Sequence, residues 1–433
     1  MRSENTTTKP FIHNNKGHVF TRPDLSDFEI VERKFRGHPD SLTDMIAQRF
    51  SQLYIENAWK IYPEFNNKYF PNFSADKITL CGASTEYVGS KYTVIKPIQA
   101  LLLGKITDKI GNTTFDIDNI FIKSIKDIFS KSLNSNLSED HFVTSIYSVN
   151  QAGSDHNKGF YNPKSTDDLL KILSNETVAN DTVYVVAYAP LTTTEKLTIA
   201  LDNKTSGEDF KKLFPQVGTD IKALIRRRAS SYDVTMCIPI MPEEVSTNKE
   251  YLSILKQVTE YLEEYIESYI LQNDGEKKIS DLRLWTNTKD TIDKKYFAVW
   301  GTALSKGDIG AVGRGNRQQG FISGNRPSTN EAFPGKNPNH FSGVIYQLVA
   351  EEIANDIFEQ LGLSNVVYIT ANNGELLNKP NSVDIILDSD NTTYNKQVAK
   401  IVNNSLNSID NLRQNYIQSD IFDRFMAKAQ NIQ

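Results

Sequence analysis

The sequence predicts an α+β protein, in which clusters of strands are separated by long helices. Apolar residues recur at helical spacing in several stretches, and short runs of β-branched and aromatic residues are bounded by turn residues. The clustering of these runs favours α+β domains over a regularly alternating doubly wound sheet. With 433 residues, 39% of them hydrophobic, the chain is long enough for two or three ordinary cores.

The predicted elements follow in order along the chain. Residues 1–27 are rich in Thr, Asn and Lys without sustained periodicity and predict a flexible N-terminal arm, so ordered structure is expected over 28–433. One-sided apolar patterns predict helices at 44–62, 117–129, 249–271, 342–361 and about 394–416. Strands are predicted at 77–82, 182–190, 233–240, 296–303, 366–370 and 383–388.

Composition and charge exclude several classes of protein. A formal net charge of −5 argues against a nucleic-acid-binding surface, so we expect no nucleic-acid partner. No run approaches the roughly 18 apolar residues of a membrane span and the N-terminus lacks an apolar signal core, so we expect no membrane partner and a cytoplasmic location. Cys81 and Cys237 lie in apolar stretches and are expected to be buried structural thiols.

The most informative stretch runs from Gly307 to Lys336 and combines many glycines with three arginines and a lysine. Glycine lets backbone N–H groups approach phosphate oxygens, and guanidinium groups bind the same oxygens bidentately. The stretch therefore predicts a polyphosphate-binding loop, although glycine-rich loops are often only turns. It contains neither a Walker A sequence nor a G-x-G-x-x-G that opens a helix, which disfavours the two common nucleotide-binding folds.

A second constellation, Gly37-His38-Pro39-Asp40, directly precedes the first predicted helix. An imidazole and a carboxylate at the positive end of a helix can place one group on a phosphate and the other on a hard divalent cation. Two plainer readings remain open, in which Asp40 is only the N-cap of the helix and His38 is a structural histidine.

Three further positions carry weaker signals. Asp181 enters a predicted strand and could bind a ribose hydroxyl or an ammonium group, but an Asx turn explains it equally well. Lys222 precedes three consecutive arginines, where a solvated basic face is the alternative. Gly153-Ser154-Asp155 forms a small polar turn that is compatible with phosphate binding.

Six motifs, collinear from about residue 28 onward, together resemble those of archaeal-type S-adenosylmethionine synthetases. They are ERK-x-x-GHPDS-x-x-D at 32–44, ANDT-(x)5-YAPL-x-x-TE at 179–195, P-x-VG-x-DIK at 215–222, TNT-x-D at 286–290, GD-x-G-x-VGRGNR at 307–317 and RP-x-x-x-EA-x-x-GKNP at 326–338.

The resemblance implies methionine adenosyltransferase activity. In this family the methionine sulfur attacks the ribose C5′ of ATP and expels triphosphate, which the same site cleaves to pyrophosphate and phosphate. The resemblance further implies ATP and L-methionine as substrates, Mg²⁺ as cofactor, K⁺ as a monovalent activator, and a homodimer with active sites at the subunit interface. It also implies three structurally similar, interleaved α+β domains around a pseudo-threefold axis within residues 28–433.

Roles for individual residues follow from the matched motifs. The resemblance implies that charge on the departing triphosphate is stabilised by His38, Lys222, Arg314 and Lys336. It implies magnesium ligation by Asp40 and Asp308. Substrate contacts are implied for Glu32 and Asp181, which would hold the nucleoside and methionine, and for Asp308, Gly153, Ser154, Asp155, Gly313 and Arg317.

The chain departs from the family pattern at several positions. Phe35 and Arg36 stand where small or aliphatic residues are usual, Ile309 replaces a second acidic residue, and Val344 replaces a lysine. These departures motivate two alternatives. One is a noncatalytic, nucleotide-binding regulatory paralogue, and the other is a synthetase that acts on a methionine analogue or mainly hydrolyses triphosphate.

Overall fold

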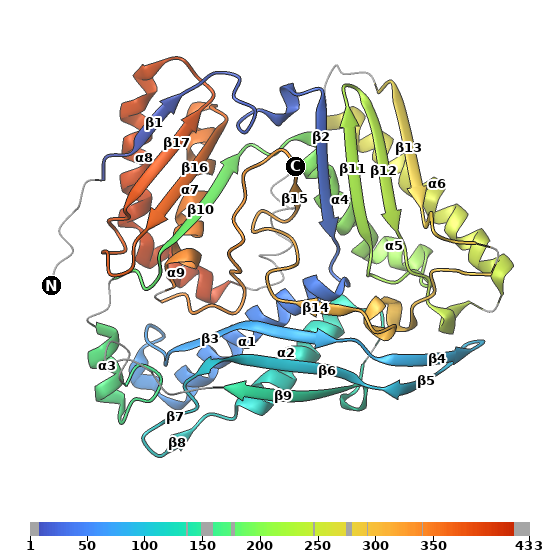
Figure 1. The fold of residues 1–433 in the computed structure, drawn as a ribbon, viewed down its shortest axis with the longest axis horizontal. Coiled ribbons are helices and arrows are strands. Elements are labelled where there is room, and N and C mark those ends of the chain that lie inside the picture. Colours follow the sequence, from blue (N-terminus) through green and yellow to red (C-terminus); the bar gives the residue numbers. More distant parts are fainter. Residues whose placement is uncertain are drawn as a thin grey trace.

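The computed structural model describes residues 8–135, 137–148, 159–174, 178–245, 247–273, 279–291, 293–339 and 341–419. Three larger sheets each pack against their own helices (Figure 1). The predicted α+β class is therefore confirmed. In the described part of the chain, no helix has the length and apolar character needed to cross a membrane.

The first unit is the sheet β14-β3-β6-β9, which is backed by two helices. Its elements are α1 (Pro39–Ile61), β3 (Phe73–Cys81), β6 (Ile98–Ile106), α2 (Ile117–Ser132), β9 (Phe142–Ser148) and β14 (Ile309–Ala311). Helix α2 begins where the Asp116 carboxylate accepts a hydrogen bond from the Asn119 N–H, and its buried residues recur at helical spacing. These buried residues belong to the same hydrophobic core as those of α1 and the sheet.

The second unit is the sheet β13-β12-β11-β2-β15. Its elements are β2 (Phe28–Lys34), α4 (Thr193–Ser206), α5 (Glu208–Leu213), β11 (Lys222–Arg228), β12 (Ser231–Cys237), α6 (Asn248–Asn273), β13 (Asp281–Thr286) and β15 (Ile322–Ser323). A capping box formed by Thr192 and Glu195 starts α4. This unit has its own buried cluster, to which α6 contributes one apolar face.

The third unit is the sheet β1-β17-β16-β10, packed against α7. Its elements are β1 (Phe11–Asn14), β10 (Val183–Ala189), α7 (Ser342–Leu361), β16 (Asn365–Ala371), β17 (Ser382–Leu387), α8 (Asn395–Asn407) and α9 (Ile409–Gln418). Helix α7 ends at Gly362, which adopts the left-handed conformation with φ +67°. The hydrophobic core of this unit is continuous with that of the first unit.

Smaller elements project from these units. They are the hairpin of β4 (Ser84–Val88) and β5 (Lys91–Lys96), the hairpin of β7 (Lys109–Ile110) and β8 (Thr113–Thr114), and α3 (Thr166–Ser174). Short 3-10 turns occur at Pro23–Leu25, Pro63–Phe65, Glu139–His141, Pro242–Glu244, Val299–Gly301, Ala303–Ser305 and Thr392–Tyr394.

Three expectations from the sequence are wrong. Residues 296–303 form no strand, because Trp300 has a φ of +61° and two short 3-10 turns follow each other here. The helix expected at about 394–416 is divided into α8 and α9 at Ser408. Cys237 is exposed and Cys81 is only half-buried, so neither is a fully buried thiol.

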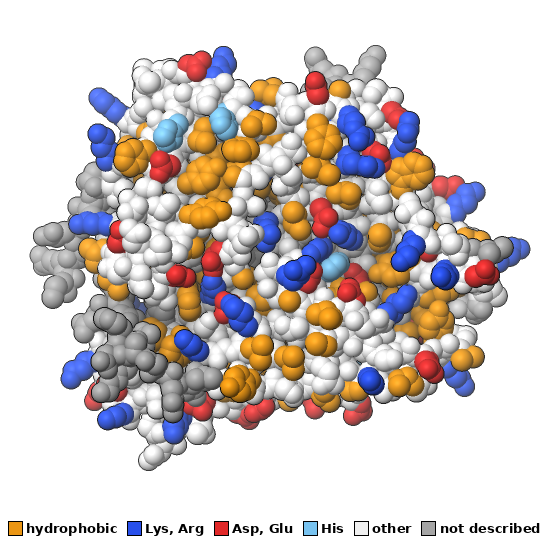
Figure 2. Space-filling view, in the orientation of Figure 1, with side chains coloured by type: hydrophobic (Ala, Val, Ile, Leu, Met, Phe, Trp, Pro, Cys, Tyr) orange, Lys and Arg blue, Asp and Glu red, His pale blue; other side chains and the backbone are white. Residues whose placement is uncertain are grey.

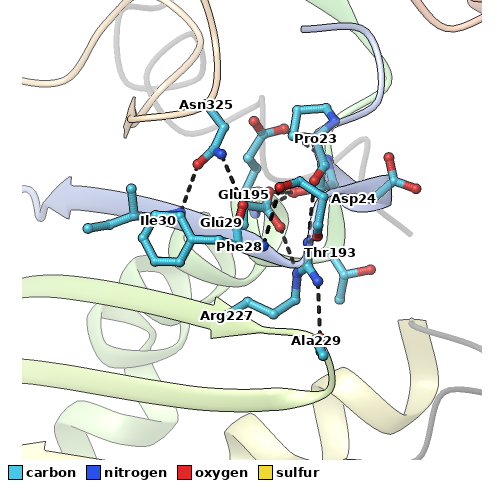
Figure 3. A network of polar contacts seen from close by, with 12 residues as sticks. Pro23, Asp24, Phe28, Glu29, Ile30, Thr193, Glu195, Arg227, Ala229 and Asn325 are labelled. Atoms are coloured by element: carbon cyan, nitrogen blue, oxygen red, sulfur yellow. Dashed lines mark hydrogen bonds and ion pairs between the residues drawn. The ribbon is translucent and has the colours of Figure 1, made fainter. Parts of the chain in front are cut away.

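Residues 8–27 differ from the expected flexible arm. Strand β1 pairs in parallel with β17 and completes the third sheet. A buried arginine of β11, Arg227, binds the carbonyl oxygens of Pro23 and Ser26 and the Glu29 carboxylate (Figure 3). Hydrogen bonds to backbone groups thus hold residues 8–27 in place, although the side chains of this segment show no periodic apolar pattern. The division of residues 28–433 into domains stays a prediction.

The stretch between β14 and α7 passes all three units and places the glycine-rich loop at the centre of the molecule (Figure 1). Strand β14 pairs with β3 of the first unit, and β15 pairs with β2 of the second. At the start of α7, the Ser342 hydroxyl donates to the carbonyl of Asp181, just before β10 of the third unit.

Candidate active site

The first group of candidate residues lies where β2 ends and α1 begins. His38 is the N-cap residue of α1, and its Nδ1 accepts a hydrogen bond from the Asp40 N–H at 3.2 Å. Because Nδ1 is an acceptor, the ring proton of neutral His38 lies on Nε2. The reading of Asp40 as the N-cap is therefore wrong, since His38 caps the helix and Asp40 lies in its first turn.

His38 is electrically neutral at neutral pH. Burial lowers the pKa of His38 to about 4, against the opposing effect of Asp40. Lys34 and Lys222 also lower this pKa, whereas Asp308 raises it. The imidazole thus lies among two ammonium groups and two carboxylates, which come from β2, β11, α1 and the residue that precedes β14. Three of these four charged groups belong to the predicted site.

Asp40 is almost fully buried and both of its carboxylate oxygens have partners. Oδ2 lies 2.9 Å from the Lys34 ammonium, and Oδ1 accepts a hydrogen bond from the Ala311 N–H at 3.1 Å. The Lys34 ammonium also donates to the carbonyl of Arg314. Asp40 and Lys34 therefore join the start of α1 to the glycine-rich loop.

The loop turns sharply at Gly313, whose φ is +82°, and leaves the Arg314 side chain exposed. The Gly313 N–H donates to the Asp44 carboxylate at 2.8 Å, and its carbonyl accepts from Arg317 Nη1 at 3.2 Å. Behind the turn lies a small cavity of about 50 Å³, lined in part by Asp44, Gly313 and Arg317. The predicted site residues Gly313, Arg314 and Arg317 thus belong to one hydrogen-bonded turn.

Lys222 and Asp308 are two further charged residues near His38. The Lys222 ammonium lies 3.1 Å from the carboxylate of Glu32, on the adjacent strand β2. The Asp308 side chain is exposed, while its carbonyl accepts a hydrogen bond from the Gly82 N–H at 2.9 Å. The structure therefore brings Glu32, Lys222 and Asp308 into the neighbourhood of His38.

Lys336 and Asp181 form a second group. Lys336 is 8% exposed, and its ammonium forms an ion pair with Glu331 and lies 4.0 Å from Asp76. Burial lowers the pKa of Lys336, while Asp76 and the nearby Asp181 raise it. Among the described residues, no hydrogen bond or ion pair joins this group to the one around His38. Gly153, Ser154 and Asp155 lie outside the described residues.

An open hollow of about 550 Å³ lies beside the second group. It is lined by the edges of β10 and β16 and by the segment before Lys336, namely Thr182, Val183, Tyr184, Thr329, Asn330, Glu331, Thr370, Ala371 and Asn372. Figure 2 shows basic, acidic and histidine side chains together near the middle of the face in view, between hydrophobic side chains that spread over the sheets.

Several residues at the site were missed by sequence reasoning. Lys34, Asp44, Asp220 and Glu331 all lie inside matched motifs, but nothing in the motifs shows which backbone groups they hold. The Asp220 carboxylate, for example, accepts a hydrogen bond from the Ala303 N–H at 2.7 Å, and burial raises its pKa to about 7. Such contacts depend on tertiary structure.

Comparisons with known proteins point to one family. A family model described as S-adenosylmethionine synthetase matches residues 18–420. The chain is 32% identical over 369 residues to the S-adenosylmethionine synthase of Pyrococcus furiosus, covering 84% of this chain and 86% of that protein. It is 28% identical over 411 residues to the S-adenosylmethionine synthase of Thermoplasma volcanium, covering 91% and 95%.

A solved structure extends the comparison to the fold. It is described as an unusual S-adenosylmethionine synthetase from Campylobacter jejuni, has a TM-score of 0.52 and 14% sequence identity, and covers 93% of this chain and 99% of that chain. At this identity the likeness concerns the fold alone.

Proposed function

Because this chain belongs to the S-adenosylmethionine synthetase family and is a methionine adenosyltransferase, we propose that it forms S-adenosylmethionine by attack of the L-methionine sulfur on the ribose C5′ of ATP. The sulfur–carbon bond forms as the C5′–O bond breaks, and the electron pair leaves with the triphosphate. The same site then hydrolyses triphosphate to pyrophosphate and phosphate. The neutral His38 beside Lys34, Lys222 and the Arg314 turn is the observation that carries this proposal.

The proposed reaction needs charge stabilisation rather than a general base. A thioether has no proton to lose, so alignment and exclusion of water supply part of the rate. Negative charge grows on the oxygen that leaves C5′, and preorganised donors lower that barrier. His38 would donate its Nε2–H to this oxygen, and the exposed Arg314 guanidinium would bind the phosphate oxygens. Lys222 could release its ion pair with Glu32 as phosphate binds.

The carboxylates fit the magnesium ion that the family implies. The described residues contain no group of three or more His, Cys, Asp or Glu side chains placed to hold a metal. This is compatible with Mg²⁺, which often takes one or two carboxylates and completes its shell with water and substrate phosphates. Asp40 and Asp308 would hold the ion, and when bound it would neutralise phosphate charge. Activation by K⁺ stays a prediction.

A homodimer with active sites at the interface is part of the proposal. Among the residues that the structure describes, no hydrogen bond or ion pair joins the group around Lys336 and Asp181 to the group around His38, so a partner subunit could complete each half. Large hydrophobic side chains are exposed on the strands of all three sheets, including Phe11, Phe28, Leu103, Val143, Tyr147, Tyr184 and Trp285. A second copy of the chain would cover such surfaces.

One assay tests the proposed function. The purified chain is incubated with ATP, L-methionine, Mg²⁺ and K⁺, and S-adenosylmethionine, pyrophosphate and phosphate are quantified. We expect the three products in equal amounts. Nucleotide binding without a sulfonium product would instead indicate a regulatory paralogue, and phosphate release without S-adenosylmethionine would indicate a triphosphate hydrolase.

A further inference from the structure

Asp44 is a buried carboxylate for which the proposed reaction gives no role. It lies on α1, one helical turn after Asp40, and is 3% exposed. A buried carboxylate is costly unless it is ion-paired or hydrogen-bonded. Among the described residues Asp44 makes no ion pair, and burial raises its pKa to about 7, while hydrogen bonds from the backbone N–H groups of Gly313 and Gly315 oppose this rise. Its partners are therefore the two residues on either side of Arg314.

The loop backbone lies directly on this carboxylate. The Gly313 N–H is 2.8 Å from Asp44 Oδ1, and a Cβ built on Gly315 would lie 2.1 Å from Asp44 Oδ2. No side chain larger than hydrogen fits at Gly315 without moving the turn or the carboxylate. Both carboxylate oxygens are thus engaged by one short turn.

Asp40 and Lys34 also hold the loop backbone but leave the Arg314 side chain exposed. Asp40 accepts from the Ala311 N–H, and Lys34 donates to the carbonyl of Arg314. The Arg314 N–H itself donates to the Ala311 carbonyl at 3.2 Å. The backbone on both sides of the guanidinium is therefore fixed, while its side chain remains exposed.

We propose that Asp44 is a positioning residue, which holds the Gly313–Gly315 turn through its two carboxylate oxygens and thereby presents the Arg314 guanidinium to the triphosphate. This inference rests on the proposed function of Arg314. An asparagine at this position has one acceptor oxygen, and its amide group would face an N–H donor. Asp44→Asn should therefore release one side of the turn while preserving side-chain volume.

The test is a double-mutant cycle of wild type, Asp44→Asn, Arg314→Ala and the double variant. Calorimetry with Mg²⁺ measures the tripolyphosphate Kd on imidotriphosphate, an analogue that the site cannot hydrolyse, and initial rates give kcat and KM for each substrate. We expect Asp44→Asn to weaken tripolyphosphate binding about tenfold, which is the scale of one hydrogen bond to a charged group. The kcat/KM for ATP should fall similarly, while the KM for methionine stays unchanged.

The double variant decides how Asp44 acts. If Asp44 works through Arg314, then Asp44→Asn added to Arg314→Ala should change the tripolyphosphate Kd by less than about twofold. The inference would be overturned if the Kd increase of the double variant equalled the product of the increases in the two single variants. A normal Kd and normal kinetics in Asp44→Asn would also overturn it while leaving the proposed function intact. If Arg314→Ala alone changes neither quantity, the proposed role of Arg314 fails instead.

Two more variants guard against a purely structural explanation. Gly315→Ala keeps the Asp44 carboxylate but displaces the turn, so it should show the same loss of tripolyphosphate affinity even if Asp44→Asn folds poorly. Ser51→Ala removes another buried hydrogen bond of α1, from its hydroxyl to the Ala47 carbonyl, and should leave the Kd unchanged. Normal affinity in folded Gly315→Ala would contradict the proposal.

Discussion

The charged residues at the start of α1 are held in pairs whose members are both largely buried. Lys34 and Asp40 have side chains that are only 13% and 9% exposed, and they lie 2.9 Å apart. Removing one member of a buried pair leaves the other charge without compensation, which typically costs more than the pair itself contributes. Stability and catalysis are therefore coupled at these residues.

Asp40→Asn should destabilise the fold by about 3 kcal/mol, because it leaves the Lys34 ammonium buried beside a neutral amide. Lys34→Met in the same chain should restore most of this loss, since the unpaired charge is then removed. Urea unfolding at pH 7 of both variants and the wild type measures the effect. A loss below about 1 kcal/mol for Asp40→Asn would show that the pair is effectively solvated.

Asp220 gives stability a pH dependence with a definite sign. Burial raises its pKa to about 7, whereas the unfolded chain loses this proton near pH 4. Between these two pH values the folded chain binds one more proton than the unfolded chain. The free energy of unfolding is therefore highest below about pH 4 and falls as the pH rises to about 7. The stability of wild type relative to Asp220→Asn should fall by on the order of 1.4 kcal/mol per pH unit in this window.

Chemical denaturation from pH 4.5 to 8, without Mg²⁺ or nucleotide, measures this slope. Asp209→Asn, on an exposed position of α5, is the matched control and should leave the slope as in wild type. A constant difference between wild type and Asp220→Asn across the range would contradict the raised pKa.

Much of the candidate site could be predicted from the residues themselves. His38, Asp40, Lys222, Asp308 and Arg314 each combine a reactive group with a local setting, such as a helix start or a glycine turn, that sequence reveals. The partners that hold them could not be predicted, because Asp44 and Asp220 act by accepting hydrogen bonds from backbone far away in sequence. Every residue type except proline supplies a backbone N–H, so the identity of the donor residue does not reveal the contact.

Among the elements, β14 shows how a short strand can be fixed by one close approach. A Cβ on its Gly310 would lie 2.2 Å from the Pro39 carbonyl oxygen and 2.3 Å from Thr43 Oγ1 of α1. The strand therefore sits against the first turn of the helix that carries His38 and Asp40. Strand β14 pairs with β3 in a register that aligns Ile309 with Cys81. This register also fixes the position of Asp308, which directly precedes β14.

Gly310→Ala should cost about 2 kcal/mol of stability, within the range for overpacked sites, because a methyl group would push β14 away from α1. It should also reduce turnover, since Asp308 and the Arg314 turn flank this strand. Gly374→Ala is the control: its φ is +90°, nothing lies within 4 Å of the added Cβ, and only a backbone cost of about 1 kcal/mol is expected. Thermal unfolding and turnover check both variants, and equal activities would contradict the packing argument.

Helices and strands were predicted correctly where the apolar periodicity was strong. The prediction failed where the backbone conformation of a single residue determines the path of the chain. Helices α1, α2, α6 and α7 have one-sided apolar patterns, and each is present. The run at 296–303 has the composition of a strand, but Trp300 adopts a left-handed conformation and turns the chain. The next residue, Gly301, lies in close contact with Gly218, which is distant in sequence, and no local pattern reveals such a contact.

For the whole molecule, we predict a dimer because hydrophobic side chains are exposed on faces of the sheets. Leu103 of β6 and Tyr147 of β9 are aligned neighbours and are 42% and 69% exposed. Replacing both by lysine should convert the dimer to monomer, because two buried charges would oppose association. Sedimentation velocity measures the oligomeric state. Leu213→Lys is the control, because Leu213 is an exposed apolar residue on a helix, α5, rather than on a sheet.

Turnover distinguishes two arrangements of the site in that experiment. If the groups around His38 and Lys336 are completed by a partner, the Leu103→Lys, Tyr147→Lys variant should lose activity together with dimerisation. A fully active monomer would place the complete site within one chain. A variant that remains dimeric would show that association uses another surface.

The pairing of β1 with β17 also affects how the protein is made. Strand β1 is translated long before its partner β17, so the third sheet stays incomplete until β17 has left the ribosome. Until then, the edges of β1 and β10 are open to pairing with other nascent chains. Stalled or truncated translation products that lack β16 and β17 should therefore be especially prone to aggregate and depend on chaperones.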